Sequence, residues 1–139
     1  MKKVFLIFFI FLFSSGTFAK NESAAELDEL FEKLKKTNNP ISARKIEGKI
    51  WKLWTTHPSE ESLTDLLAKG SEYMAQNQLT SAHNVFSKAI ELDPNWAEAW
   101  NKRATVLYLM GNFELSQNDI DMVLKLEKRH FGALSGQGL

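Results

Sequence analysis

A regular period runs through the second half of the chain and constrains its fold more than any other feature. Residues 63–96 and 97–130 are two units of equal length that follow one another without a gap. Laid over each other, they share few identities but agree in size and polarity at many positions. A fixed period of about 34 residues is typical of repeat architectures, in which each unit buries an apolar face against its neighbour. We therefore predict a stack of similar units.

The two units join at an Asp-Pro turn. A helical pattern ends at Leu92, and a new one begins just after Trp96. Pro94, between them, cannot continue a helix and fixes the turn. The second unit has Lys128 at the matching place, a departure that weakens the expected boundary there.

The matching positions resemble the tetratricopeptide repeat. In that family, helix A carries a large residue, then a small one where the two helices cross, then an aromatic residue or leucine. These places hold Leu66, Gly70 and Tyr73 in the first unit and Trp100, Ala104 and Leu107 in the second. Turns at Asn77-Gln78 and Gly111-Asn112 follow, and helix B then carries Ala82, Phe86 and Ala89, or Ser116, Ile120 and Val123. The resemblance implies an all-α fold, a right-handed solenoid of antiparallel helical hairpins with these residues as its structural core.

Two helices are predicted before the repeats. Residues 23–36 carry an apolar stripe at i, i+3, i+4 and i+7, one face of a helix: Leu27, Leu30, Phe31 and Leu34. A second helix is expected from Pro40 to about Thr55. Asn39 is suited to cap it, and Pro40 suits its first turn because the missing N–H is not needed there.

These two helices fit the repeat poorly, since Lys35 and Lys36 fall where a core residue and a small residue are wanted. We expect residues 20–58 to form a helical hairpin that packs like a repeat and caps the N-terminal end of the stack. Ser59 is the expected N-cap of the first helix in the repeat region, residues 59–139.

Residues 131–139 have the pattern of a third helix A, with Leu134 and Gly138 in the large and small places. Terminal repeats usually present a polar outer face, whereas this end is apolar. Two explanations remain. The sequence is a fragment of a longer reading frame, which we favour, or another chain completes the stack by self-association.

The first nineteen residues have the pattern of a secretory signal. Lys2 and Lys3 precede an apolar run from Val4 to Phe13, and small residues around Ala19 offer a cleavage point. The run is too short to span a bilayer, which takes about 20 residues. We predict cleavage after Ala19 and a periplasmic location in a bacterium, with an uncleaved inner-membrane anchor facing the periplasm as the alternative.

Charge and composition exclude several functions. Cleavage would remove two of the 17 basic residues and none of the 17 acids, leaving a net charge of −2, which argues against an electrostatic nucleic-acid binder. The chain has no Cys, so disulfides and thiolate metal sites are impossible. His57, His83 and His130 lack metal-ligand spacing. We expect no enzyme activity, no cofactor and no metal, with membrane contact only through an uncleaved signal.

The four Trp residues have packing roles in this interpretation. Trp54 and Trp100 are expected in the core, and Trp96 is expected to cover the joint between the repeats. Trp51 lies off the apolar stripe of its helix and either packs on the first repeat or is exposed.

In the tetratricopeptide family the A helices line a concave groove, so the resemblance implies a binding face there. The expected partner-binding residues are Leu67, Ser71, Met74, Glu98, Asn101, Lys102, Thr105 and Tyr108, with Thr64, Ala75 and Leu109 beside them. The Lys/Asn set that grips a C-terminal carboxylate in chaperone-binding members is not matched, because Leu67 and Ser71 occupy those places.

The sequence thus predicts a non-catalytic periplasmic scaffold or adaptor that binds a protein or peptide in this groove. Two alternatives stay open. The repeats are the N-terminal module of a longer envelope enzyme or assembly factor, or they belong to a self-associating structural protein.

Overall fold

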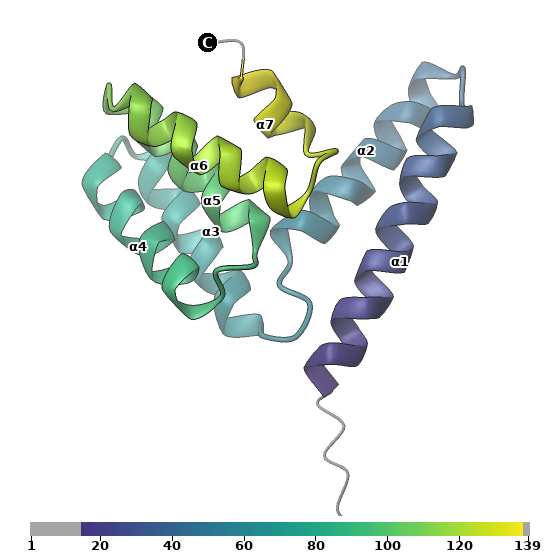
Figure 1. Cartoon of the computed structure of the whole chain (residues 1–139), viewed down its shortest axis with the longest axis horizontal. Helices are drawn as coiled ribbons and strands as arrows, with labels where there is room; N and C mark the ends of the chain where they lie inside the picture. Colours follow the sequence, from purple (N-terminus) through teal and green to yellow (C-terminus); the bar gives the residue numbers. More distant parts are fainter. Residues whose placement is uncertain (1–14, 138–139) are drawn as a thin grey trace, which may run out of the picture.

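A computed structural model describes residues 15–137, and within this range every regular element is an α-helix. The helices follow one another as α1 (Ser15–Lys36), α2 (Pro40–Thr55), α3 (Glu61–Ala75), α4 (Leu79–Leu92), α5 (Ala97–Leu109), α6 (Phe113–Leu126) and α7 (Phe131–Gly136). Figure 1 shows α3 to α6 stacked side by side, with the α1–α2 hairpin projecting from the stack. The predicted all-α helical solenoid is confirmed.

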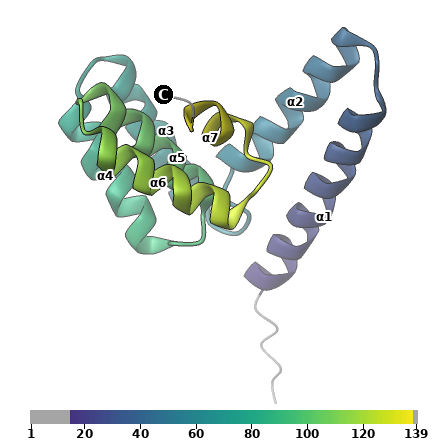
Figure 2. The same ribbon diagram turned by 45° about the horizontal axis from the view of Figure 1, so that its top comes forward.

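Each repeat helix packs against the next one along the chain, from α3 through α7. Figure 2 shows α7 beside α6 and close to the end of α2. The largest core cluster lies between α3, α4 and α5 and centres on Phe86 and Val106, both fully buried. A smaller cluster joins α5, α6 and α7 through Ala104, Val123 and Ala133.

The turn inside each repeat needs a residue that tolerates left-handed backbone. Asn77 has φ 57°, and Gly111, at the equivalent place in the second repeat, has φ 78°. The backbone N–H groups of the next residues, Gln78 and Asn112, donate to the carbonyls of Tyr73 and Leu107 at 2.8 and 2.9 Å. Asn and Gly are the residues that adopt this conformation most readily, so the two turns are equivalent although their residues differ.

The joints between repeats are also equivalent. The side chain of Asp93 accepts a hydrogen bond from the N–H of Asn95 at 2.8 Å, and that of Glu127 accepts one from the N–H of Arg129 at 2.9 Å. The second joint therefore keeps its geometry with Lys128 in place of Pro94. An acidic side chain two residues before the bonded N–H organises both turns.

Helices α3 and α4 cross where the sequence has a small residue. A Cβ added to Gly70 would lie 2.4 Å from Cε1 of Phe86, far inside contact distance. In the second repeat Ser116 Oγ donates to the carbonyl of Ala104 at 2.8 Å, which ties α6 to α5. The expected reason for the small residue, close approach of the two helices, is confirmed.

The predicted structural core is distributed unevenly. Most of it is buried: Gly70, Ala82, Phe86, Ala89, Ala104, Leu107 and Ile120. Leu66, Tyr73 and Trp100 are half-buried at the edges of the clusters. Pro94 and Gly111 are exposed because they lie in turns, where backbone conformation rather than burial explains them.

Helix α2 begins as the sequence indicates, with Pro40 in its first turn and the Asn39 side chain accepting from the N–H groups of Ile41 and Ser42. The prediction for Ser59 is wrong. Glu60 is the N-cap of α3, and the backbone N–H groups of Ser59 and Glu60 instead donate to Nδ1 of His57, at 3.4 and 3.0 Å.

The α1–α2 hairpin does not pack on the first repeat as a preceding repeat would. The end of α2 lies against α5 and the α6–α7 joint. Trp54 stacks on His130 with ring centroids 4.0 Å apart, and Trp51 meets Phe131 edge-on at 4.9 Å. The indole N–H of Trp96 donates to the carbonyl of Trp54 at 2.9 Å. Aromatic side chains from both ends of the chain therefore hold the hairpin in place.

The predicted signal segment, residues 1–19, lies mostly outside the described residues. Residues 15–19 form the start of α1, which begins well before the predicted Ser23. Gly138, expected in the third helix A, also lies outside them. Among the helices of residues 15–137, none is long and apolar enough to cross a membrane.

Candidate functional site

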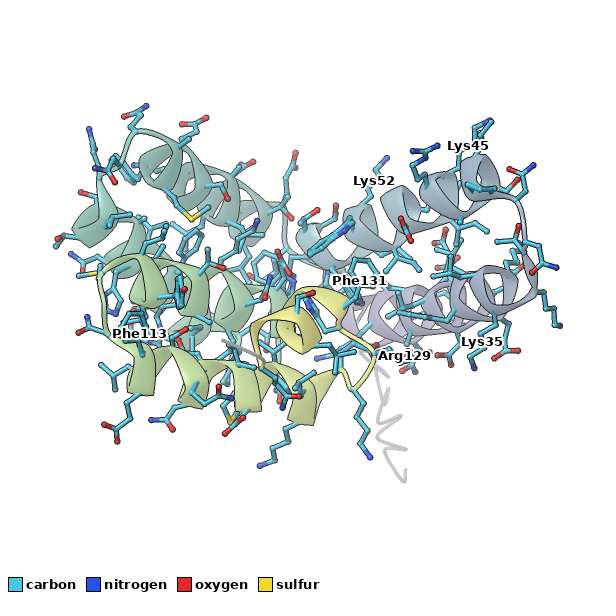
Figure 3. All side chains as sticks on the ribbon, turned by 90° about the horizontal axis from the view of Figure 1, so that it is seen from above. Lys35, Lys45, Lys52, Phe113, Arg129 and Phe131 are labelled. Atoms are coloured by element: carbon cyan, nitrogen blue, oxygen red, sulfur yellow. The ribbon has the colours of Figure 1, made fainter. Side chains whose placement is uncertain are left out.

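A cavity of about 260 Å³ opens between α5, α6 and α7. It is lined by Asn101, Ala104, Thr105, Tyr108, Phe113, Ser116, Gln117, Ile120, Gly132, Ser135 and Gly136. Ala104, Ile120 and Ser116 are buried in its floor, and Thr105, Gln117 and Ser135 are exposed at its rim. Figure 3 shows Phe113 at the end of the repeat region farthest from Phe131 and Arg129.

Three of the predicted binding residues line this cavity. Asn101, Thr105 and Tyr108 follow one another on α5 at i, i+4 and i+7, so one helix face carries all three. Tyr108 is 41% exposed and Phe113 is 61% exposed, and their ring centroids lie 5.2 Å apart. Two large aromatic side chains at the surface offer apolar area to a ligand. Because each has few rotatable bonds, they lose little conformational entropy when a ligand binds.

Other predicted binding residues lie elsewhere. Leu67 is only 3% exposed and belongs to the core between α3 and α4, so its placement in the groove is wrong. Met74 is half-buried against the same core. Ser71 is half-buried, and its hydroxyl donates to the carbonyl of Leu67 at 2.9 Å, a bond within its own helix. The face of α3 therefore contributes mainly packing.

Glu98 is also wrongly placed in the open groove, because its side chain is fully buried. Its Oε2 accepts from His130 Nε2 at 2.9 Å and from Asn101 Nδ2 at 3.1 Å. Its Oε1 lies 3.5 Å from Lys102 Nζ but accepts no hydrogen bond. Asn101 and Lys102 are thus partly engaged by a buried acid. Thr105 and Tyr108 are exposed, but the Thr105 hydroxyl donates to the carbonyl of Asn101 at 3.0 Å, so it offers its oxygen as an acceptor and its methyl group as apolar surface.

His57 and His130 are structural residues that the sequence interpretation missed. Each is buried, each gives Nε2–H to an acid, and each accepts at Nδ1 from the N-terminal backbone of a helix. His57 bonds Asp93 at 3.1 Å, and His130 bonds Glu98. In such a histidine, Nδ1 accepts from an otherwise unpaired N–H group at the start of a helix, while Nε2–H donates to a buried or half-buried carboxylate.

The repeat register contained a signal for His130. One repeat earlier in the sequence, the position equivalent to His130 holds Trp96, and the position equivalent to Ala133 holds Ala99. All four are buried. The aligned positions therefore predict burial for His130, whereas its residue type alone suggests exposure.

The cavity suits an inserted side chain better than bond-making chemistry. Its buried lining includes Ala104 and Ile120, which are apolar. The hydroxyls of Thr105, Ser116 and Ser135 donate to backbone carbonyls of the protein, so toward a ligand their oxygens act as acceptors. Within residues 15–137, no three His, Cys, Asp or Glu side chains gather closely enough to hold a metal ion.

Comparison with known proteins agrees with this geometry. The family model described as TPR repeat matches residues 70–111, from the crossing point of α3 to the turn after α5. A TPR repeat-containing protein of Rhizobium etli is 36% identical over 118 residues, which cover 85% of this chain and 57% of that protein. No solved structure matched significantly.

Two eukaryotic proteins are similar over shorter stretches. The mouse DnaJ homolog subfamily C member 7 is 30% identical over 42% of this chain and 12% of its own length. A tetratricopeptide repeat and J domain-containing co-chaperone of Cryptococcus neoformans is 28% identical over 50% of this chain and 13% of its own length. The chain therefore spans little more than half of the Rhizobium relative and a small part of the others. The matched segment, the relatives and the equivalent turns of the two repeats together support the tetratricopeptide-repeat family for this chain.

Proposed function

We propose that this chain is a non-catalytic adaptor that binds a segment of a partner protein in the cavity between α5, α6 and α7. The observation that carries the proposal is the set of exposed groups around one apolar floor. Tyr108 and Phe113 form an aromatic wall, and Thr105 and Ser135 stand at the rim. Tetratricopeptide repeats mediate protein–protein interaction, and the similarity to a DnaJ homolog and to a J domain-containing co-chaperone favours a protein partner.

The aromatic wall provides the test. Tyr108→Ser with Phe113→Ser removes exposed apolar surface at the cavity and touches no buried hydrogen bond. Leu92→Ser with Leu115→Ser is the matched control, since both leucines are more than half exposed and neither lines the cavity. Asn101 is left alone because its amide bonds Glu98.

Affinity capture from an extract of the source cells is the measurement. The wild-type chain and the leucine control should retain the same discrete partner, and the aromatic variant should lose it by tenfold or more, about 1.4 kcal/mol. Equal capture by all three would remove the cavity from consideration as the binding site.

We further propose that the adaptor works in the periplasm, delivered there by residues 1–19. The basic start, the short apolar run and the small residues near Ala19 support export. A fusion of the whole chain to a reporter enzyme that needs disulfides should be active, because disulfides form only after export. A Val4→Arg and Ile7→Arg variant of the fusion should be inactive. Activity of both fusions, or of neither, would contradict export by this segment.

A second role follows from the lengths of the relatives. Because the Rhizobium protein extends well beyond the matched region, the repeats also suit a binding module within a longer protein. In that case the cavity would present the partner to another domain, and the same variants test it.

A further inference from the structure

The α1–α2 hairpin carries an uneven charge that packing in the hairpin does not explain. Between residues 33 and 49 the sequence holds six basic side chains and one acid, Glu47; the basic ones are Lys33, Lys35, Lys36, Arg44, Lys45 and Lys49. Lys33 and Lys35 pair with acids of α1. Within the described residues the other four make no ion pair, and neither does Lys52 farther along α2.

Three of these lysines form a stripe along one face of α2. Lys45, Lys49 and Lys52 recur at i, i+4 and i+7, and all three are exposed. Figure 3 shows Lys45 and Lys52 along the same side of α2. The opposite face of α2, with Ile50 and Trp54, is buried. We name Lys45, Lys49 and Lys52 the basic stripe.

The acids near the stripe are few and belong to α1. Glu26 lines a shallow pocket together with Lys49 and Lys52. Glu29 is engaged mainly by Lys33, which lowers its pKa, with a smaller contribution from Lys49. Lys45 and Arg44, nearer the tip of the hairpin, make no ion pair among the described residues, and the acid nearest to them in sequence is Glu47. The tip is therefore the most positive part of the hairpin.

An apolar residue begins the same face. Ile41, four residues before Lys45, is 61% exposed at the tip of the hairpin. From Ile41 to Lys52 the face extends about 16 Å at 1.5 Å per residue. A straight array of cations with an exposed aliphatic side chain at its end fits an extended anionic surface better than it fits a pocket. Phospholipid headgroups attract the cations, and the acyl boundary accepts the apolar side chain.

We propose that the basic stripe and Ile41 bind the surface of an anionic phospholipid bilayer. The contact lies on the hairpin and leaves the cavity between α5, α6 and α7 open to a partner. It does not depend on the proposed adaptor function, and it does not require residues 1–19 to remain attached.

Vesicle flotation tests the proposal with the whole chain. Neutral vesicles contain phosphatidylcholine alone, and anionic vesicles contain about 30% phosphatidylglycerol as well. Residues 4–13, if retained, would bind both kinds, so the difference between the two isolates the charge contribution. Wild-type protein should prefer the anionic vesicles at low salt and lose the preference in about 0.5 M salt, where the Debye length falls to a few ångströms.

Charge reversal at the stripe is the decisive variant. Lys45→Glu, Lys49→Glu and Lys52→Glu together should weaken binding to anionic vesicles by more than about a hundredfold, since each cation contributes about fivefold near such a surface and each new carboxylate is repelled by it. Lys88→Glu, Lys125→Glu and Lys128→Glu make the same change in net charge on the repeats and should retain most of the binding. Circular dichroism checks that each triple variant is folded. If the stripe variant with three Glu residues unfolds, a variant with Gln at the same three positions takes its place. Ile41→Ser should weaken binding to the anionic vesicles several-fold at low salt, where the basic stripe holds the hairpin at the surface.

Three results would overturn the proposal. One is equal binding of wild type to neutral and anionic vesicles. Another is equal loss in the stripe and control variants, which would reflect net charge alone. The third is tight binding of poly-glutamate with no preference for anionic vesicles, which would assign the stripe to an acidic protein.

Discussion

His130 Nε2 lies 2.9 Å from Glu98 Oε2, and neither side chain reaches solvent. The pair joins the start of α5 to the start of α7, and Trp54 of α2 stacks on the imidazole. Three segments far apart in the sequence therefore meet at one buried hydrogen bond. The α1–α2 hairpin and α7 both contact α5 at this point.

Loss of one partner from this pair should destabilise the fold strongly. His130→Ala leaves Glu98 buried with only Asn101 as hydrogen-bond donor, and breaking a buried pair costs about 3–5 kcal/mol. Urea denaturation of the wild type and variant measures the change. Glu98→Leu with His130→Phe should cost less than the sum of the single changes, because the buried carboxylate and its imidazole donor are removed together. Part of the cost should remain, since the N–H of Ala133 and the amide of Asn101 lose their acceptors. Additive costs would show that the bond contributes little.

Gly70→Ala should destabilise the protein by about 1–3 kcal/mol, since the new Cβ would overlap the Phe86 ring. Gly48→Ala is the control. Gly48 lies inside α2 with no atom within 4 Å of an added Cβ, so alanine there should stabilise by up to about 1 kcal/mol. Thermal unfolding of both variants gives the comparison. A Gly70→Ala midpoint at or above that of the wild type would mean that α3 and α4 do not cross as closely as described.

Arg129 should govern how firmly α1 is held. Its guanidinium pairs with Asp28 at 2.7 Å and lies 4.3 Å from the ring centroid of Phe31. Arg129→Ala should speed backbone hydrogen exchange in residues 24–36 more than in residues 97–109. Lys128→Ala, one residue earlier and exposed, is the control and should change neither segment. Uniform acceleration in both segments would indicate global destabilisation instead.

Glu127 should make part of the stability depend on pH. Burial raises its pKa, but the hydrogen bonds from the side chain and backbone of Arg129 outweigh burial and hold the pKa below the ordinary 4.5. A depressed pKa means that the folded state favours the carboxylate. This stabilisation is present above the unfolded pKa and is lost as pH falls through the lower folded pKa.

In the Glu127→Gln variant the free energy of unfolding should therefore fall less steeply between about pH 5 and pH 3 than in the wild type. Urea midpoints across this range measure the slope. Glu114→Gln, on the exposed start of α6, is the matched control and should keep the wild-type slope. If the urea midpoint of the Glu127 variant falls with pH as steeply as that of the wild type, carboxylates other than Glu127 cause the loss of stability in acid.

The repeat pattern predicted the helices and their crossings because each depends on local rules. Asn39 and Pro40 define a helix start from their own chemistry, and Gly70 indicates a close approach. The repeat register also aligned Asn77 with Gly111, which the structure explains by their shared left-handed backbone.

Contacts between distant segments could not be predicted in this way. The hairpin position depends on Trp54 meeting His130, near the other end of the chain, and no periodicity links them. Leu67 and Glu98 were placed in the groove by family register, yet the first packs in the core and the second pairs with His130. A polar side chain is buried only where a partner satisfies it, and that partner becomes known only from the tertiary structure.

Photo-cross-linking at position 105 in living cells tests the central claim most directly. Thr105 lines the cavity and is exposed, so a photoreactive residue there should capture the bound partner segment as a discrete adduct. The same residue at Asn118, exposed on α6 and outside the cavity lining, should give none. Adding Tyr108→Ser should weaken the adduct at position 105. Equal adducts at both positions, or none at 105 while 118 captures a protein, would contradict binding in the cavity.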